Sequence, residues 1–312
     1  MKYSIVIPVY KNEASIEALM HKLCELNHSL QQSLEVVFVV DGSPDNSFAM
    51  LKKALPHIPF EVQLLAHSRN FGSFAAIRTG LMAARGDFFG VMAADLQEPP
   101  ELLVDFFRLL SRDECDVAVG SRSSRQDPLL TRWASALFWG LYRKLIVPEM
   151  PKGGVDVFAC NRAFREPLLQ LEEARSSLIA LIFWLGFRRK IVYYDRQARQ
   201  GGRSAWTLKK KVDYMLDSIF AFTDVPIRLL MILGGGGLCF SLLGGAIILL
   251  SKISGIIPVP GYAATMLAIL AFGAFNSLGL GLVGTYAWRA YENTKRRPLS
   301  IVSCKIEAQK PL

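Results

Sequence analysis

The stretch Val-Val-Phe-Val-Val-Asp-Gly-Ser at residues 36–43 joins an uninterrupted apolar run to a polar turn. A short continuous apolar run is typical of a strand that is buried on both faces of a parallel sheet. Similar runs occupy residues 4–9, 62–66, 88–93 and 117–120, and segments with helical spacing separate most of them. This alternation predicts an α/β fold with a mostly parallel sheet.

Polar residues or glycines follow each run, at the point where the strand is expected to end. In open sheets of this kind, ligands bind beyond the carboxyl ends of the strands. Turn formation accounts for any one of these segments, but 5 of them at one edge indicate a ligand site. The segments are Pro8 to Glu13, Asp41 to Asp45, Arg69 to Gly72, Ala94 to Pro100 and Gly120 to Arg122.

The common phosphate-binding loops are missing from the sequence. No Gly-x-Gly-x-x-Gly follows the first strand and no Gly-Lys-Ser/Thr loop occurs, which excludes the usual dinucleotide fold and the P-loop nucleotidases. Asp95 and Gln97, at an expected strand end, offer carboxylate and amide oxygens instead. Because such oxygens suit a hard divalent cation, we expect a metal ion to bind here and to neutralise the charge of a phosphate group.

The length of the chain allows about two structural units, and the apolar residues are expected to be concentrated in one of them. Of 312 residues, 51% are hydrophobic, and 36 Lys and Arg against 27 Asp and Glu give a formal charge of +9. This apolar content excludes intrinsic disorder, and the 5 scattered cysteines lack disulfide or metal-ligand spacing. Because the basic residues lie beside apolar segments and no nucleic-acid motif occurs, we expect no nucleic-acid partner.

The apolar residues are concentrated near the C-terminus. Residues 229–251 and 253–288 contain no charged side chain, and prolines and a glycine at 258–261 break the second stretch. About 20 apolar residues cross a hydrocarbon core of about 30 Å. The pattern therefore predicts a transmembrane hairpin with spans at about 229–251 and 264–286. A buried pair of core helices is the alternative, but neither segment has a polar face.

Basic residues on both sides of the hairpin set its expected orientation. Arg228 precedes the first span, and 4 Lys or Arg residues lie between 289 and 297. We therefore expect a multi-pass protein of the inner membrane with its catalytic domain and both termini in the cytoplasm. The expected regions are a cytoplasmic domain at 1–225, the transmembrane hairpin at 226–290 and a basic cytoplasmic tail at 291–312.

Two segments of the cytoplasmic domain have the amphipathic character of helices that lie in a membrane interface. They are residues 129–147 and 209–222, where basic side chains alternate with large apolar ones. They predict contact with anionic membrane lipids, although a core helix remains the alternative for 129–147. Small residues repeat every four positions in both spans, which predicts close helix packing, either within the hairpin or in a homo-oligomer.

Five motifs occur in a fixed order along the chain. They are Ser-Ile-Val-Ile-Pro-Val-Tyr at 4–10, Val-Asp-Gly-Ser-Pro-Asp at 40–45, Arg-Asn-Phe-Gly at 69–72, Ala-Asp-Leu-Gln-Glu-Pro-Pro-Glu at 94–101 and Gly-Ser-Arg at 120–122. This ordered set resembles the family 2 glycosyltransferases. With the C-terminal hairpin, nearly the whole chain is similar to the polyisoprenyl-phosphate group, which includes dolichol-phosphate-mannose synthases and bactoprenol glucosyltransferases.

The resemblance implies a GT-A fold, in which a Rossmann-like sheet binds a nucleotide sugar. It further implies inverting transfer of the sugar from a UDP- or GDP-linked donor to a polyprenyl phosphate such as undecaprenyl phosphate. Mg²⁺ or Mn²⁺ is the implied cofactor, the cytoplasmic leaflet is the implied place, and the product would serve envelope glycan or lipid modification.

The resemblance also assigns roles to residues at matching positions. The implied nucleotide-sugar-binding residues are Pro8, Tyr10, Glu13, Asp41, Arg69, Asn70, Asp95, Gln97, Arg199 and Ser204. The implied metal ligands are Asp95 and Gln97, the acceptor-phosphate residues are Arg122, Arg132 and Ser135, and the catalytic residues are Asp95 and Asp156. Because a phosphate with a second pKa near 6 is largely ionised at neutral pH, we expect Asp156 to orient groups rather than remove a proton.

Two positions depart from the family's usual pattern. Ala93 stands at the first acid of the usual Asp-x-Asp-Leu-Gln, and Val40 at the first acid of Asp-Asp-Gly-Ser. The missing carboxylates motivate a second hypothesis, a degenerate, non-catalytic membrane-bound protein that binds nucleotide sugar or lipid phosphate. A processive polysaccharide synthase is a further alternative, but Arg132-Trp133 lacks the glutamine of the Gln-x-x-Arg-Trp motif typical of that class.

Overall fold

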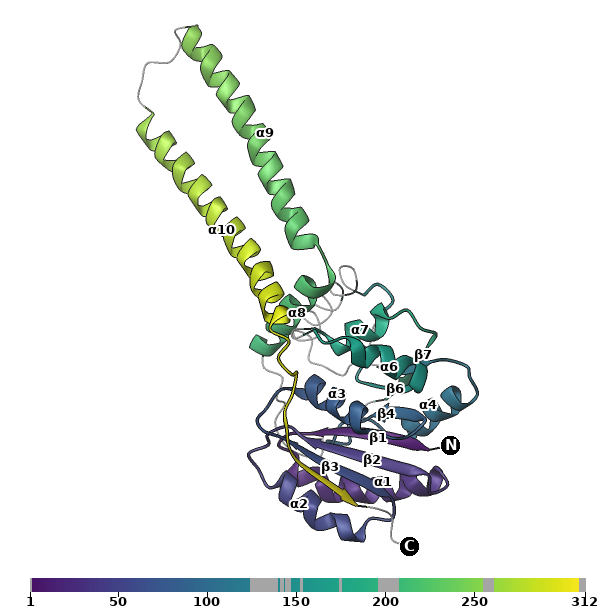
Figure 1. The fold of residues 1–312 in the computed structure, drawn as a ribbon. Coiled ribbons are helices and arrows are strands. Elements are labelled where there is room, and N and C mark those ends of the chain that lie inside the picture. Colours follow the sequence, from purple (N-terminus) through teal and green to yellow (C-terminus); the bar gives the residue numbers. More distant parts are fainter. Residues whose placement is uncertain are drawn as a thin grey trace. The chain divides into compact units, whose positions relative to one another are not determined.

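The chain divides into two compact units in the computed structural model (Figure 1). The first unit contains Met1–Tyr214 and Arg297–Leu312, and the second contains Met215–Arg296. The structure describes residues 2–123, 140, 143, 147–151, 154–173, 176–195, 208–254 and 261–308.

An eight-stranded sheet organises the first unit, with the strand order β7-β5-β6-β4-β1-β2-β3-β8. Strands β1 to β4 are parallel neighbours, β7 is parallel to β5, and β6 and β8 run antiparallel to the strands beside them. The strands are β1 (Tyr3–Val9), β2 (Leu34–Val40), β3 (Glu61–His67), β4 (Phe88–Val91), β5 (Val117–Arg122), β6 (Val157–Asn161), β7 (Arg189–Tyr194) and β8 (Val302–Ala308).

The structure confirms the five strands predicted from apolar runs, and it adds three that the sequence analysis did not predict. In β7 most side chains are exposed or half-buried, and in β8 exposed and half-buried side chains alternate along a sheet edge. Neither strand therefore has the continuous apolar run that marks a buried strand. Strand β8 also lies in the segment 291–312, which the sequence analysis treated only as a basic tail.

Helices cover both faces of the sheet (Figure 1). Leu19 and Leu23 of α1 belong to the same buried cluster as Ile5 and Ile7 of β1. On the opposite face α3 comes so close that a Cβ atom on Gly80 would lie 2.2 Å from Cγ1 of Val6, so only glycine fits there. The helices are α1 (Ile16–Ser29), α2 (Ser47–Ala54), α3 (Ser73–Ala83), α4 (Glu101–Ser111), α6 (Arg162–Gln170) and α7 (Leu178–Trp184), with short 3-10 turns η1 (Glu13–Ser15) and η2 (Leu55–His57).

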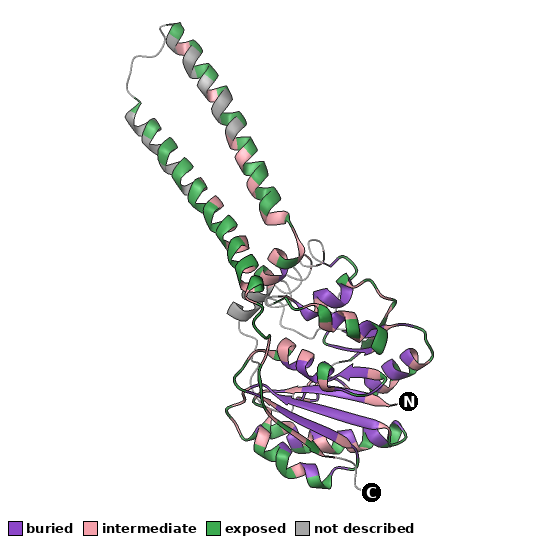
Figure 2. Ribbon diagram, viewed as in Figure 1, coloured by how far each residue is buried: buried purple, intermediate pink, exposed green. Residues whose placement is uncertain are grey.

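The hydrophobic core lies along the central strands. Every residue of β2 is buried, and Figure 2 shows the buried positions gathered in the sheet and in the inward faces of the helices. Burial of these apolar side chains stabilises the sheet. The loops after β1 to β5 meet at the carboxyl edge of the sheet, and they therefore begin from well-packed strands.

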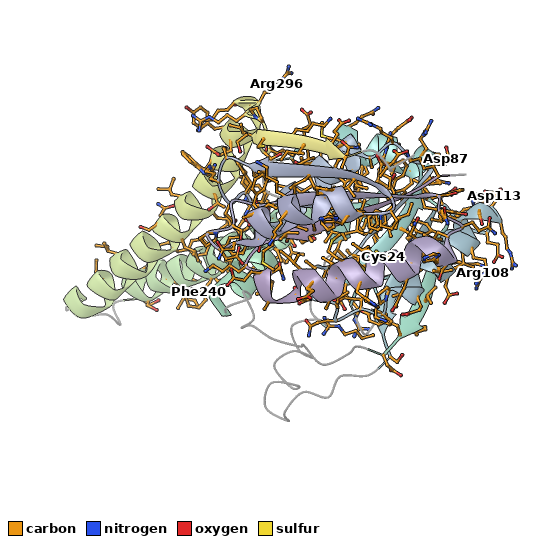
Figure 3. All side chains as sticks on the ribbon, turned by 90° about the horizontal axis from the view of Figure 1, so that it is seen from below. Cys24, Asp87, Arg108, Asp113, Phe240 and Arg296 are labelled. Carbon is orange, nitrogen blue, oxygen red and sulfur yellow. The ribbon has the colours of Figure 1, made fainter. Side chains whose placement is uncertain are left out.

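Two long helices dominate the second unit. They are α9 (Val225–Ile253) and α10 (Tyr262–Thr294), and α8 (Leu208–Phe222) runs into this unit from the first. Most described positions of both long helices are exposed (Figure 2), and they include large apolar residues such as Phe240 of α9, labelled in Figure 3, which is 79% exposed. Among the residues that the structure describes, no helix combines the length and apolar character needed to cross a membrane. The predicted spans therefore stay a prediction.

Within the second unit, α8 packs against the end of α10. Nη2 of Arg289 donates to Oδ1 of Asp217 at 2.6 Å, and the rings of Phe220 and Tyr286 meet edge to face at 5.3 Å. The predicted helix at 209–222 is thus confirmed as a helix. The predicted interfacial helix at 129–147 falls mostly outside the described residues.

Candidate active site

Four loops at the carboxyl edge of the sheet contain a residue with positive φ. Lys11 follows β1 with φ 57°, Gly42 follows β2 with φ 57°, Gly72 follows β3 with φ 101°, and Leu96 follows β4 with φ 52°. This left-handed conformation costs a non-glycine residue about 1–2 kcal/mol, so Lys11 and Leu96 are held against a local preference. Strain of this kind occurs at functional sites, but Gln31, Gln32, Asp113 and Arg296 also have positive φ away from this edge. The hydrogen bonds of these loops therefore define the candidate site, rather than the strain alone.

Asp45 ties the loop after β1 to the loop after β2. Its carboxylate accepts hydrogen bonds from the hydroxyls of Ser43 at 2.6 Å and Ser47 at 2.8 Å, and from the backbone N–H of Glu13 at 3.1 Å. In return, the Glu13 carboxylate accepts from the backbone N–H of Asn46 at 3.0 Å. Burial raises the pKa of Asp45, but these hydrogen bonds outweigh it and lower the pKa below its ordinary value.

Asp41 ties the loop after β2 to the loop after β3. Its side chain is 3% exposed, and its two oxygens accept hydrogen bonds from the backbone N–H groups of Phe71 at 2.8 Å and Gly72 at 2.7 Å. Burial works to raise the pKa of Asp41, but hydrogen bonds from His67 and the two amides together lower it. The carboxylate is thus ionised and engaged within the protein, and its direct contact with a nucleoside stays a prediction.

Gly42 allows these two loops to approach. A Cβ atom at this position would lie 2.3 Å from the carbonyl carbon of Arg69 and 2.4 Å from the backbone nitrogen of Asn70. The side chains of Arg69 and Asn70 are exposed at the edge. The Arg69 guanidinium lies 4.1 Å from the centre of the Phe71 ring, which orients it by a cation–π contact.

Asp95 and Gln97 lie on the turn that follows β4, with the strained Leu96 between them. Both are half-buried, and Ser15 fixes the start of the turn by donating its hydroxyl to the carbonyl of Ala94 at 2.8 Å. Ala93 supplies no side-chain oxygen. In the described part of the chain, no three His, Cys, Asp or Glu side chains group together as a metal site. The carboxylate and amide oxygens of Asp95 and Gln97 nevertheless suit Mg²⁺, which commonly takes only one or two protein ligands beside water and phosphate oxygens.

A second cluster joins the ends of β5 and β7 to the residue before β6. Arg122 donates through Nε and Nη2 to both oxygens of Asp156, the second bond being 2.7 Å, and the side chains are 21% and 24% exposed. The hydroxyl of Tyr194 donates to Oδ2 of Asp156 at 2.9 Å. A paired guanidinium with further N–H groups is suited to hold a phosphate.

The pKa values of this cluster reflect its partly buried charges. Burial lowers the pKa of Arg122, but the hydrogen bond and the charge of Asp156 outweigh it and raise the pKa. Burial raises the pKa of Tyr194 strongly, and the charges of Asp156 and Glu98 add to that effect. Tyr194 therefore stays a hydrogen-bond donor at neutral pH.

The structure thus places most of the predicted site residues at one edge. Pro8 pairs with Val39 inside the sheet, Tyr10 is half-buried at the end of β1, and the other described candidates lie on the loops above. The four remaining candidates, Arg132, Ser135, Arg199 and Ser204, lie outside the described residues. Asp45, His67 and Tyr194 had no predicted role. The contacts of His67 with Asp41 and of Tyr194 with Asp156 join segments far apart in the chain, and Asp45 links its own turn to Glu13.

The fold and this edge define a GT-A type sugar transferase, and sequence comparison gives its family. The chain belongs to glycosyl transferase family 2, whose family model matches residues 4–171. It is 31% identical to the undecaprenyl-phosphate 4-deoxy-4-formamido-L-arabinose transferase of Proteus mirabilis, over 99% of this chain and 95% of that protein. It is 29% identical to the bactoprenol glucosyl transferase of Shigella phage SfX, over 98% of this chain and 100% of that protein. The predicted resemblance, to family 2 and to its polyprenyl-phosphate group, is confirmed.

A solved structure supports the fold. The mannosyltransferase PcManGT from Pyrobaculum calidifontis, in complex with GDP-Man and Mn²⁺, is similar with a TM-score of 0.50 and 18% identity, covering 93% of this chain and 84% of that chain. At this identity the likeness concerns the fold alone. It agrees with the predicted GT-A architecture.

Proposed function

We propose that this glycosyltransferase transfers a sugar, with inversion, from a nucleotide sugar to a polyprenyl phosphate such as undecaprenyl phosphate. The observation that carries the proposal is the meeting, at one sheet edge, of two clusters of different chemistry. Asp95 and Gln97 offer oxygens beside the donor loops, whereas Arg122 offers a cation held by Asp156. One cluster suits a sugar diphosphate with its metal, and the other suits a phosphate acceptor.

The donor is held by the loops after β1 to β4. Arg69 and Asn70 are exposed and lie on a loop that Asp41 fixes through Phe71 and Gly72. Such pre-organised loops reduce the entropy lost when a ligand binds. We propose a UDP- or GDP-linked sugar as the donor. The relatives are named as transferases of two different sugars, glucosyl and formamido-arabinose.

Asp95 and Gln97 would hold the divalent cation, Mg²⁺ or Mn²⁺. When bound, such a cation stabilises negative charge on the departing diphosphate. Asp95 and Gln97 supply one carboxylate and one amide group, and Ala93 adds no oxygen. Donor phosphate oxygens and water would complete the coordination that a hard cation requires.

The acceptor phosphate would lie against Arg122. In the transfer step an oxygen of the lipid phosphate bonds to the anomeric carbon, and the bond from that carbon to the diphosphate oxygen breaks. The nucleoside diphosphate leaves with the electron pair. Because a phosphate monoester with a pKa near 6 is already ionised, no proton has to be removed. Asp156, which accepts from Arg122 and Tyr194, then orients the guanidinium rather than acting as a base.

We further propose that α9 and α10 anchor the enzyme in the inner membrane as a multi-pass protein, with the catalytic unit and both termini in the cytoplasm. The exposed apolar side chains of both helices support this, because in water such a surface would be unfavourable. Lys295 at the end of α10 lies 5.0 Å from the Trp288 ring and 4.2 Å from the Tyr291 ring. Aromatic and basic residues together are typical of a membrane interface. Contact with anionic lipids and a homo-oligomeric assembly are parts of the same proposal.

The test is transfer of radiolabel from nucleotide sugars to undecaprenyl phosphate by the full-length protein in detergent. We expect transfer with Mg²⁺ or Mn²⁺, loss of transfer with EDTA, and loss in Asp95→Asn. The matched control is Asp87→Asn, since Asp87 is an exposed residue (Figure 3). Nucleotide-sugar binding without any turnover would favour the non-catalytic binding hypothesis instead.

A further inference from the structure

Four side chains from separate segments form a hydrogen-bonded relay behind the donor loop. Nδ1 of His67 lies 2.8 Å from Oδ1 of Asp41, and Nε2 of His67 lies 2.9 Å from Oγ1 of Thr79. Oγ1 of Thr79 lies 2.7 Å from Oγ of Ser300. The relay therefore connects the end of β2, the end of β3, helix α3 and the segment that leads into β8.

The centre of the relay is closed to solvent. The His67 side chain is 0% exposed, that of Asp41 is 3% exposed, and Thr79 is buried. Because the ionised Asp41 carboxylate can only accept, Nδ1 of His67 must carry a hydrogen and donate it. In a neutral His67 the Thr79 hydroxyl then donates to Nε2 and accepts from Ser300, so every group in the relay has a partner.

The relay acts on the loop that contains Arg69 and Asn70. Asp41, fixed by His67, accepts from the amides of Phe71 and Gly72. The His67 ring also meets the Phe71 ring edge to face at 5.5 Å, and Phe71 in turn lies under the Arg69 guanidinium. His67 thus reaches the loop in two ways, through a carboxylate and through a ring contact.

The segment that follows α10 also holds the chain on both sides of His67. The backbone N–H of Ser68 donates to the carbonyl of Ile301 at 2.9 Å, and Ser303 donates its hydroxyl to the carbonyl of Ala66 at 3.0 Å. These bonds continue the antiparallel pairing of β8 with β3. Both neighbours of His67 in the chain are therefore tied to the segment that follows α10.

We propose that His67 is a positioning residue for nucleotide binding: by donating to Asp41 it fixes the Arg69 to Gly72 loop in the conformation that receives a nucleoside diphosphate. The inference rests on the proposed function and deepens it, because it assigns a role to a residue outside the family motifs. If His67 had a structural role alone, any side chain that fills the space and keeps its polar atoms hydrogen-bonded would be sufficient. If His67 positions the loop, the side chain at position 67 must have a hydrogen-bond donor at the place of Nδ1, where it reaches Asp41.

Two amide substitutions separate these roles. In His67→Asn the short side chain places its N–H₂ group near the position of Nδ1, so the hydrogen bond to Asp41 is kept while that to Thr79 is lost. In His67→Gln the longer side chain places its amide near the position of Nε2, so the hydrogen bond to Thr79 is kept while that to Asp41 is lost. Each variant loses one hydrogen bond of the buried relay, which makes the two a matched pair for stability.

The experiment measures two properties of the full-length protein in detergent with Mg²⁺. Titration calorimetry gives the Kd for UDP and for GDP, and hydrogen exchange followed by mass spectrometry reports on the peptide that contains residues 68–73. Thermal unfolding of each variant checks folding. His57→Asn and His57→Gln are the controls, since His57 is exposed and precedes β3, whereas the loop follows the other end of that strand.

We expect His67→Gln to weaken binding of the preferred nucleotide by roughly tenfold or more, as loss of a hydrogen bond to a charged group does, and to speed exchange in 68–73. We expect His67→Asn to stay within about threefold of the parent in Kd and to keep its slow exchange. Equal behaviour of the two variants, or parent-like exchange in His67→Gln, would overturn the inference. If the parent binds neither nucleotide, the proposed donor class fails, while the exchange measurement still decides whether His67 fixes the loop.

Discussion

Two aspartates at the same sheet edge are held in different ways. Asp41, after β2, is 2% exposed and accepts hydrogen bonds from two backbone amides and from buried His67. Asp156, before β6, is partly exposed and is held by the side chains of Arg122 and Tyr194. Asp41 is thus held largely by the backbone, whereas Asp156 is held by two side chains. In the proposed function, Asp41 supports the donor loops and the Arg122 and Asp156 pair receives the acceptor phosphate.

The largest effect should come from the acceptor side. Arg122→Ala removes the cation and leaves Asp156 with Tyr194 but without its charged partner, so we expect transfer to fall by about 100- to 1000-fold, as when a key charge-stabilising donor is lost. Nucleotide affinity, set by the other side of the edge, should change little. Initial transfer rates and calorimetric Kd values for UDP and GDP measure the two properties.

Arg108→Ala is the control for this prediction. Arg108 is an exposed residue of α4 (Figure 3) that forms a surface ion pair with Asp105, a contact that contributes little. A parent-like transfer rate in Arg122→Ala, or an equal loss in Arg108→Ala, would contradict the proposed acceptor role.

A smaller effect is expected from the hydroxyl that supports Asp156. Tyr194→Phe keeps the ring that packs beside Gly120 but removes one hydrogen bond, so we expect transfer to fall by about threefold to tenfold. The loss should appear at saturating donor and should leave the nucleotide Kd unchanged. Tyr193→Phe is the neighbouring control, because Tyr193 is 63% exposed. A change in nucleotide affinity instead of rate would place Tyr194 on the donor side.

The last prediction concerns stability: Asp41→Asn should destabilise the fold and, because Asp41 fixes the Arg69 to Gly72 loop, should also weaken nucleotide binding. An amide nitrogen cannot accept from the Phe71 or Gly72 amide, so we expect the free energy of unfolding to fall by about 2 kcal/mol. Since folding lowers the pKa of Asp41 from its ordinary value of 3.8, its stabilising effect is complete above that value and is lost as the pH falls through the lower, folded-state pKa. The difference in melting temperature between parent and variant should be constant from about pH 5 to 8 and shrink below about pH 4. A difference that grows on acidification would contradict this assignment.

The predictable parts of the fold are those with a local signal. Continuous apolar runs predicted β1 to β5, and the family resemblance led to Asp95, Arg122 and Asp156, which the structure places at the carboxyl edge and whose roles stay predictions. In contrast, β8 has only exposed and half-buried residues, so it lacks the apolar run that marks a buried strand. Its pairing with β3, which is far away in the sequence, could not be predicted from a local pattern. Likewise, the hydrogen-bond partners of His67 and Tyr194 lie on other loops and on α3, so these contacts become visible only when the fold brings those segments together.

The most direct test of the central claim compares two lipid acceptors in one assay. The parent protein is given a radiolabelled nucleotide sugar with either undecaprenyl phosphate or undecaprenol, which has the same chain but no phosphate. We predict that label enters the lipid phase with the phosphate alone, and that this transfer requires Arg122. Equal labelling of the alcohol, or no labelling of either lipid with any nucleotide sugar, would contradict the claim that this edge joins a sugar diphosphate to a lipid phosphate.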